Sequence, residues 1–129
     1  MSNYDAPIHS TYTLKAATVS AAATLLSIVG PAGKQGHLVG MSAVVTTSTT
    51  VAATALSVGI TGTLGKYGSL SVPIATAGPA AAYNAMTSLT TGATNGSAVL
   101  IAADTAILLS SDGGSTAGAA DITVTITWF

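Results

Sequence analysis

The stretch DITVTITWF, residues 121–129, alternates apolar and polar side chains with a period of two residues. Such alternation of β-branched residues predicts a strand that is buried on one face only. On this pattern Trp128 follows the apolar side into the core, and Phe129 points the opposite way. Residues near a terminus fray unless they are held in a sheet, so a strand that ends on the only Trp and the only Phe predicts a central position. Phe129 would then face a neighbouring subunit or a larger particle, or alternatively pack against a loop of its own chain.

Working outward from this stretch, short β-type segments recur between Gly, Pro, Asn-Gly and Asp-Gly turn signals. The segments are residues 12–30, 37–47, 54–62, 67–75, 98–103 and 105–111. Seven or eight short strands with almost no helical periodicity predict an all-β fold, an antiparallel β-sandwich of the jelly-roll type. The one helix candidate lies near 79–90, where Pro79 suits a first helical position. The length predicts a single domain, 1–129, with residues 1–11 as an extended N-terminal arm.

The composition is poor in charge. Charged residues make up 5% of the chain, the net charge is −1, and there is no cysteine; an ordinary domain carries roughly 25% charged residues. Such a surface favours a protein that packs against copies of itself or against a larger particle. Only three basic residues are available to neutralise phosphates, so nucleic acid is not an expected partner. The most apolar stretch, 16–30, is shorter than the ~20 residues of a membrane-spanning helix, so no membrane segment is expected either.

Nothing in the sequence favours catalysis. His9 and His37 are the only imidazoles, the chain has no Glu, and no nucleophile-elbow motif surrounds a serine. Gly33-Lys34 resembles the end of a phosphate-binding loop, but Gln35 stands where that motif needs Ser or Thr. The segment 30–36 is therefore interpreted as a turn with Lys34 exposed at its tip. We expect no enzymatic activity and no cofactor.

Three of the four acidic residues, Asp104, Asp112 and Asp121, fall in the last quarter of the chain. Carboxylates that lie close together could bind calcium. Each of these residues, however, lies at a strand boundary or a turn, where Asp is favoured because its side chain accepts hydrogen bonds from nearby backbone. Their spacing matches no calcium loop, and no metal site is predicted.

Three stretches, "IVGPAGKQGHLVGMSAVVTT", "ALSVGITG" and "AADTAILLSSDGGSTAGAADITVTITWF", together resemble small bacteriophage head proteins, the decoration or cement proteins of capsids. The resemblance covers most of residues 28–129 and rests on residue composition and on the order of the predicted elements. It implies a jelly-roll-like sandwich, commonly a homotrimer, that binds the major capsid protein on the outside of the virion and stabilises the head. The interface candidates under this interpretation are Phe129, Tyr83 and Lys34. The Ala-rich segment 79–85 departs from the resemblance.

Two other classes of function stay open. A carbohydrate- or receptor-binding β-sandwich is the first alternative, because jelly rolls also serve as lectins. An exposed aromatic pair such as Tyr67 with Tyr83 would favour it. The second alternative is a coat or fibre subunit that assembles by itself, although the chain is short for a principal shell protein.

Overall fold

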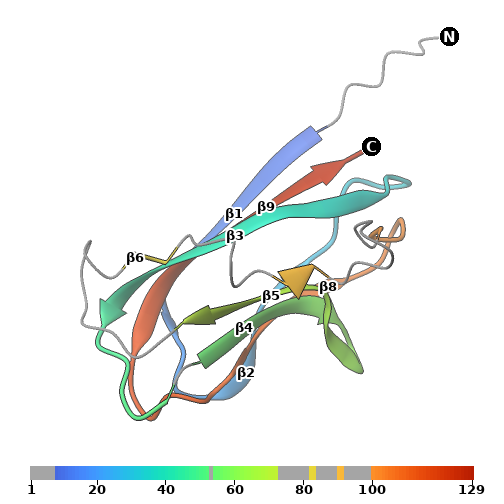
Figure 1. Ribbon diagram of the computed structural model, residues 1–129. Coiled ribbons are helices and arrows are strands. Elements are labelled where there is room, and N and C mark those ends of the chain that lie inside the picture. Colours follow the sequence, from blue (N-terminus) through green and yellow to red (C-terminus); the bar gives the residue numbers. More distant parts are fainter. Residues whose placement is uncertain (1–7, 53, 73–81, 84–89, 92–99) are drawn as a thin grey trace, which may run out of the picture.

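A computed structural model describes residues 8–52, 54–72, 82–83, 90–91 and 100–129 (Figure 1). These residues form strands joined by turns and loops, and they contain no helix. The strands are β1 (Ile8–Thr18), β2 (Ala22–Ile28), β3 (Gly36–Thr47), β4 (Thr54–Ile60), β5 (Thr63–Val72), β6 (Ala82–Tyr83), β7 (Thr90–Thr91), β8 (Ile107–Asp112) and β9 (Ala119–Trp128).

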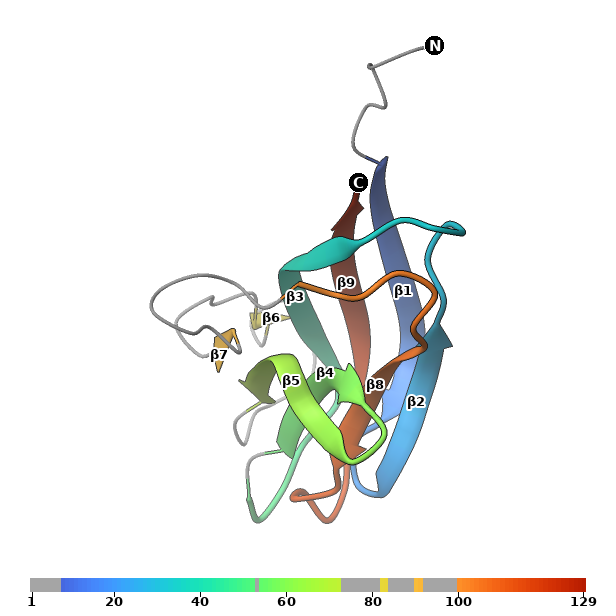
Figure 2. The ribbon, with the colours of Figure 1, turned by 90° about the vertical axis from the view of Figure 1, so that its right-hand side faces the viewer.

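Two antiparallel sheets pack face to face (Figures 1 and 2). One has the strand order β1-β9-β3-β6 and the other the order β2-β8-β4-β5-β7. The pairing is nested, since β1 pairs with β9, β2 with β8, β3 with β6 and β4 with β5. This is the order of a jelly roll, in which successive pairs of one long antiparallel ribbon alternate between two sheets. The predicted antiparallel sandwich is therefore confirmed, with seven strands of six residues or more in the described chain.

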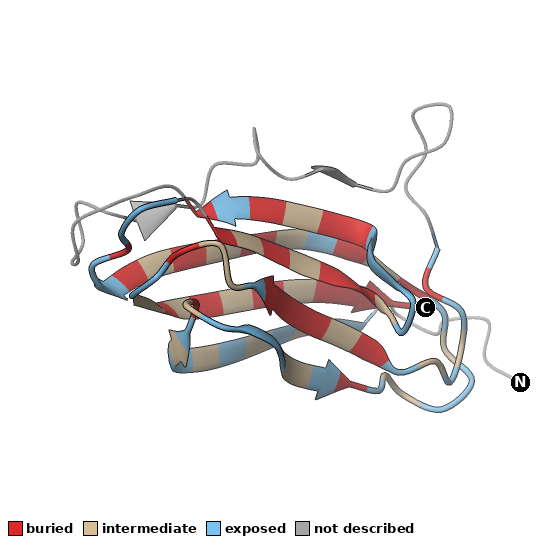
Figure 3. Ribbon diagram, turned by 90° about the horizontal axis from the view of Figure 1, so that it is seen from below, coloured by how far each residue is buried: buried red, intermediate tan, exposed pale blue. Residues whose placement is uncertain are grey.

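Strand β9 occupies the central position that its sequence predicts. It lies between β1 and β3, and its residue Ile126 is opposite Ser10 on one side and Leu38 on the other. Its even-numbered residues from Ala120 to Trp128 are at most 1% exposed and form part of the core. Figure 3 shows the resulting bands of buried and less buried residues along the strands. Burying a large aromatic or branched side chain contributes about 1.5–3 kcal/mol, so this strand supplies a substantial share of the packing energy.

The segment 12–30 is not one continuous strand. It divides at Val19–Ala21 into β1 and β2, which belong to different sheets. The crossing point is fixed by hydrogen bonds to the backbone of Val19, whose carbonyl accepts from the Thr54 and Ser111 hydroxyls at 3.0 and 3.3 Å. The amide of Val19 donates to the Gly118 carbonyl at 3.2 Å. Three contacts with remote segments thus determine where the chain changes sheets.

Other sequence-based predictions have mixed outcomes. In the expected strand 98–103, the described residues 100–103 contain only an isolated bridge from Ile101 to Gly36. Most of the expected helix near 79–90 lies outside the described residues, but Ala82 and Tyr83 pair with β3 as a short strand instead. Of the expected arm 1–11, residues 8–11 are extended and paired with β9, and residues 1–7 lie outside the described part.

Candidate interaction surface

Phe129 is held firmly at one end of the sandwich. Its amide donates to the Gln35 carbonyl at 2.8 Å, and the Gln35 amide donates to the Phe129 carbonyl at 3.0 Å. Its ring lies 5.8 Å from the imidazole of His37, between centroids, at an interplanar angle of 53°. The side chain is still 44% exposed, whereas the neighbouring Trp128 is 1% exposed. The prediction for Trp128 is confirmed, and Phe129 both contacts its own chain and presents an open face.

The loop before β3 wraps around Trp128. Gly30 and Gly36 both lie so close to the indole that a Cβ on either would come within 2.7 Å of a ring carbon. Between them the chain turns at Gly33, which has a φ of 71°, and the Lys34 amide donates to the Pro31 carbonyl at 3.1 Å. The Gly33 amide also donates to an Asp104 carboxylate oxygen at 3.0 Å. This loop is a tight turn, as predicted, and its outer glycines additionally form the packing surface for Trp128.

Most of the large exposed hydrophobic side chains of the described residues gather at this end. Ile8 is opposite Trp128, Leu100 precedes the residue that bridges to Gly36, and Val29 precedes Gly30. Val39 lies at the bulge of β3 near its beginning. We call the following set the Phe129 patch: Ile8, Val29, Val39, Leu100 and Phe129, each between 43% and 63% exposed. Exposed apolar groups that cluster in this way mark interaction surfaces more often than scattered ones do.

The structure brings two of the three predicted interface residues together. Lys34 is half-buried, so the prediction that it is exposed at the tip of the turn is wrong. It directly precedes Gln35, the residue that pairs with Phe129. Tyr83 lies in β6 opposite Ala43, two strands away from β9, and its side chain is outside the described part. The other four members of the Phe129 patch were not predicted from the sequence. A signal in the sequence was available for Val39. Leu38 and Met41 are both apolar but three residues apart, so the period of two is broken between them, as it is at a bulge.

The two histidines flank the central strand β9 on the outer face of this sheet. His9 and His37 are both opposite Thr127, one from β1 and the other from β3. The Nδ1 atom of His9 is 2.9 Å from the Thr127 hydroxyl oxygen, and His37 contacts Phe129. The imidazoles therefore border the Phe129 patch, one on each side of β9.

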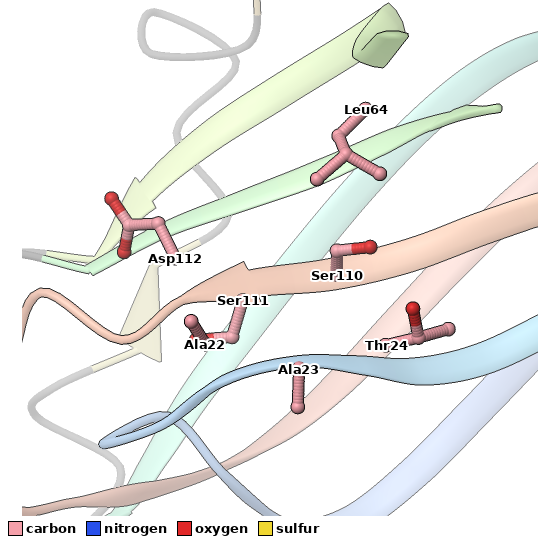
Figure 4. A pocket seen from close by; sticks show the side chains of 7 residues that line it. All are labelled: Ala22, Ala23, Thr24, Leu64, Ser110, Ser111 and Asp112. Carbon is pink, nitrogen blue, oxygen red and sulfur yellow. The ribbon is translucent and has the colours of Figure 1, made fainter. Parts of the chain in front are cut away.

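A pocket of about 430 Å³ lies on the other sheet, over β2 and β8 (Figure 4). Leu64 lines it from the start of β5, and its polar lining residues are Thr24, Ser110, Ser111 and Asp112. The Asp112 carboxylate already accepts hydrogen bonds from the amides of Ala55 and Gly114, at 3.0 and 2.9 Å. No histidine lines this pocket, and the arrangement resembles no nucleophile and base pair.

The remaining acidic groups are dispersed. Asp104 binds the amide of Gly33, and Asp121 binds the amide of Ala16 at 2.7 Å and the Lys15 ammonium at 3.5 Å. The Ala16 amide lowers the pKa of Asp121, and Lys15 adds to this effect. No group of three potential metal ligands occurs among the described residues. The predicted bond to nearby backbone is confirmed for Asp112, which accepts from the Gly114 amide. It is wrong for Asp104 and Asp121, whose partner amides belong to distant segments.

The chain is a jelly-roll β-sandwich with exposed apolar side chains at one end. No family model, curated protein or solved structure matches the chain. In the described ranges no helix is long and apolar enough to cross a membrane.

Proposed function

We propose that this chain is a structural protein of a bacteriophage particle, a decoration protein that binds the outer surface of the head and stabilises it. The observation that carries the proposal is the Phe129 patch, an apolar surface at one end of a jelly roll with very few charges. Jelly rolls are common in viral capsid proteins. The patch would contact the major capsid protein.

The construction of the patch suits a docking role. The backbone of Phe129 is fixed by two hydrogen bonds to Gln35, and its ring is braced by His37. A rigid aromatic anchor loses little conformational entropy on binding, so more of the contact energy appears as affinity. Because the contact would be mainly apolar, attachment should depend weakly on salt.

The alternative of a carbohydrate-binding module was expected to show an exposed aromatic pair such as Tyr67 with Tyr83, and one member of this pair is buried. Tyr67 is only 3% exposed and therefore offers no open ring for stacking on a sugar. The side chain of Tyr83 lies outside the described residues. No described feature favours glycan binding over docking to protein.

The test is a sedimentation assay with heads of the phage that carries the gene. Heads stripped of accessory proteins are mixed with the purified chain and pelleted through a sucrose cushion, at low and at high salt. We expect saturable co-sedimentation at both salt concentrations and greater resistance of the decorated heads to heat. A chain that stays in the supernatant with intact heads contradicts the proposal, and large particles formed by the chain alone support the coat-subunit alternative.

A further inference from the structure

Strand β1 presents an open edge. It is the outermost strand of its sheet, and β9 is its only partner in the described part of the chain. From Ile8 to Leu14 its pairing with β9 is uninterrupted, and the register shifts only between Leu14 and Ala17. The outer side of a strand carries unpaired amide and carbonyl groups, which are a template for another strand. Proteins usually protect such edges with charges, bulges or proline. Here Lys15 and the bulge lie beyond Leu14, and Pro7 precedes Ile8 in the sequence, so seven residues are left unprotected.

No other edge of the described sheets is comparable. The edge strand β2 has a bulge between Thr24 and Leu26, which divides its pairing into two short runs. The outer strands at the opposite edges, β6 and β7, have two residues each. Within the described ranges, the segment Ile8–Leu14 is therefore the longest regular stretch of an outermost strand on which a further strand could pair.

We propose that a second copy of this chain binds there, with its β1 antiparallel to β1 and centred on Thr11. In this register the segment IHSTYTL pairs with the same segment of the other copy, and the two-fold axis passes beside Thr11. Ile8 is placed opposite Leu14 of the copy, and Ser10 opposite Tyr12. Both pairs lie on the core side of the sheet, because these four residues are opposite the buried face of β9. On the outer face His9 is placed opposite Thr13 of the copy, and Thr11 opposite itself.

The pairing would provide hydrogen-bond partners for the outward-facing amide and carbonyl groups of β1 without electrostatic repulsion. The segment contains no Lys, Arg, Asp or Glu, so no like charges are opposed. Ile8 is 43% exposed, and Tyr12 and Leu14 are only partly buried against the core. A strand from a second copy would cover the open sides of these three side chains. The two-fold contact is closed, so it produces a dimer rather than the trimer that the resemblance implies. The edge shares Ile8 with the Phe129 patch but does not include Phe129. Substitutions at Thr11 therefore test the strand pairing, and substitutions at Phe129 test the proposed docking.

A cysteine scan tests the register directly, since the chain has no cysteine of its own. Opposite residues in an antiparallel pair have Cα atoms about 4.5–5.5 Å apart, which suits a disulfide. We expect Thr11→Cys to form a covalent dimer as its main product under mild oxidation. Thr13→Cys is the matched control, because Thr13 is also exposed on this face but would lie about 13 Å from its copy. Equal cross-linking of the two variants, or none with Thr11→Cys, would overturn the proposal.

A charge exchange provides a second, reversible measurement. The parent should show twice its 12.4 kDa mass by light scattering at micromolar concentration. Thr11→Lys and Thr11→Glu should each be monomeric, because like charges face each other across the two-fold axis, and an equimolar mixture should restore the dimer. Thr125→Lys, which adds the same charge one strand inward, should leave the dimer intact. A monomeric parent, or equal effects of Thr11→Lys and Thr125→Lys, contradicts the pairing.

Discussion

The indole of Trp128 occupies the space that a side chain on Gly30 would need. A Cβ at Gly30 would lie 2.5 Å from two carbons of the ring, well inside van der Waals contact. Gly36 faces the same ring from the beginning of β3, opposite Trp128 in the sheet. The loop 30–36 and the end of β9 are thus packed against one another, and this arrangement positions Phe129 on the surface.

Gly30→Ala should destabilise the fold by about 1–3 kcal/mol, because the added methyl group must displace a buried ring or move the loop. The measurement is the free energy of unfolding in urea. Gly65→Ala is the control, since a Cβ there meets no atom within 4 Å, and it should change stability by less than about 1 kcal/mol. Equal effects of the two substitutions would show that the close contact with Trp128 costs nothing.

Trp128→Ala should remove about 3–5 kcal/mol of stability, because it leaves a large cavity among buried side chains. In a domain with a total stability of about 5–15 kcal/mol, this loss lowers the melting temperature severely or prevents folding. Trp128→Phe, which retains an aromatic ring, should recover part of the loss. A melting temperature unchanged in Trp128→Ala would place the indole outside the core.

Phe129→Ala should leave the isolated fold nearly intact, within about 1 kcal/mol, since the ring is half exposed and its backbone bonds to Gln35 remain. It should nevertheless weaken attachment to phage heads, as the loss of a central aromatic anchor does. Melting curves and the sedimentation assay, run on the same preparation, separate the two effects. A variant that decorates heads as well as the parent would remove Phe129 from the docking surface. A large loss of stability would instead make its contact with His37 part of the fold.

Acid should weaken the fold partly through Asp121. The Ala16 amide, and secondly Lys15, hold the pKa of this carboxyl below its usual value of 3.8. A group whose folded-state pKa is lowered stabilises the protein above the pKa of the unfolded state, and this contribution disappears as the pH falls through the folded-state value. Asp121→Asn keeps an oxygen acceptor for Ala16 but does not titrate, so its stability should fall less steeply between about pH 4 and 2. Parallel profiles for parent and variant would contradict this coupling.

A rise in pH into the alkaline range should also weaken the fold, through Tyr67. Burial raises the pKa of this phenol above its usual value of 10.0. The neutral form is favoured in the folded state, so the contribution is complete below the unfolded-state pKa and is lost as the pH rises through the folded-state pKa. Ultraviolet titration of the folded protein should show a late-titrating tyrosine that is absent in Tyr67→Phe. Identical titration curves after correction for the number of tyrosines would show that Tyr67 ionises freely.

The sequence determined the local character of the chain. Alternation in 121–129 predicted the strand, its buried side and the inward position of Trp128, because side-chain direction along a strand depends only on backbone geometry. The turn residues around Gly33 and Gly113 likewise predicted two reversals, and both glycines have positive φ values. Local geometry has a fixed period, so it can be recognised without knowing the partner strand.

The tertiary structure alone decided which segments meet. The change of sheet at Val19 depends on acceptors and donors 35 or more residues away, at Thr54, Ser111 and Gly118. His9 and His37 flank Thr127 only because β9 lies between β1 and β3. The Phe129 patch draws on five separate segments, and the open edge of β1 exists because its sheet ends there. A pattern within one segment carries no information about these contacts, since their partners are selected by packing across the whole core.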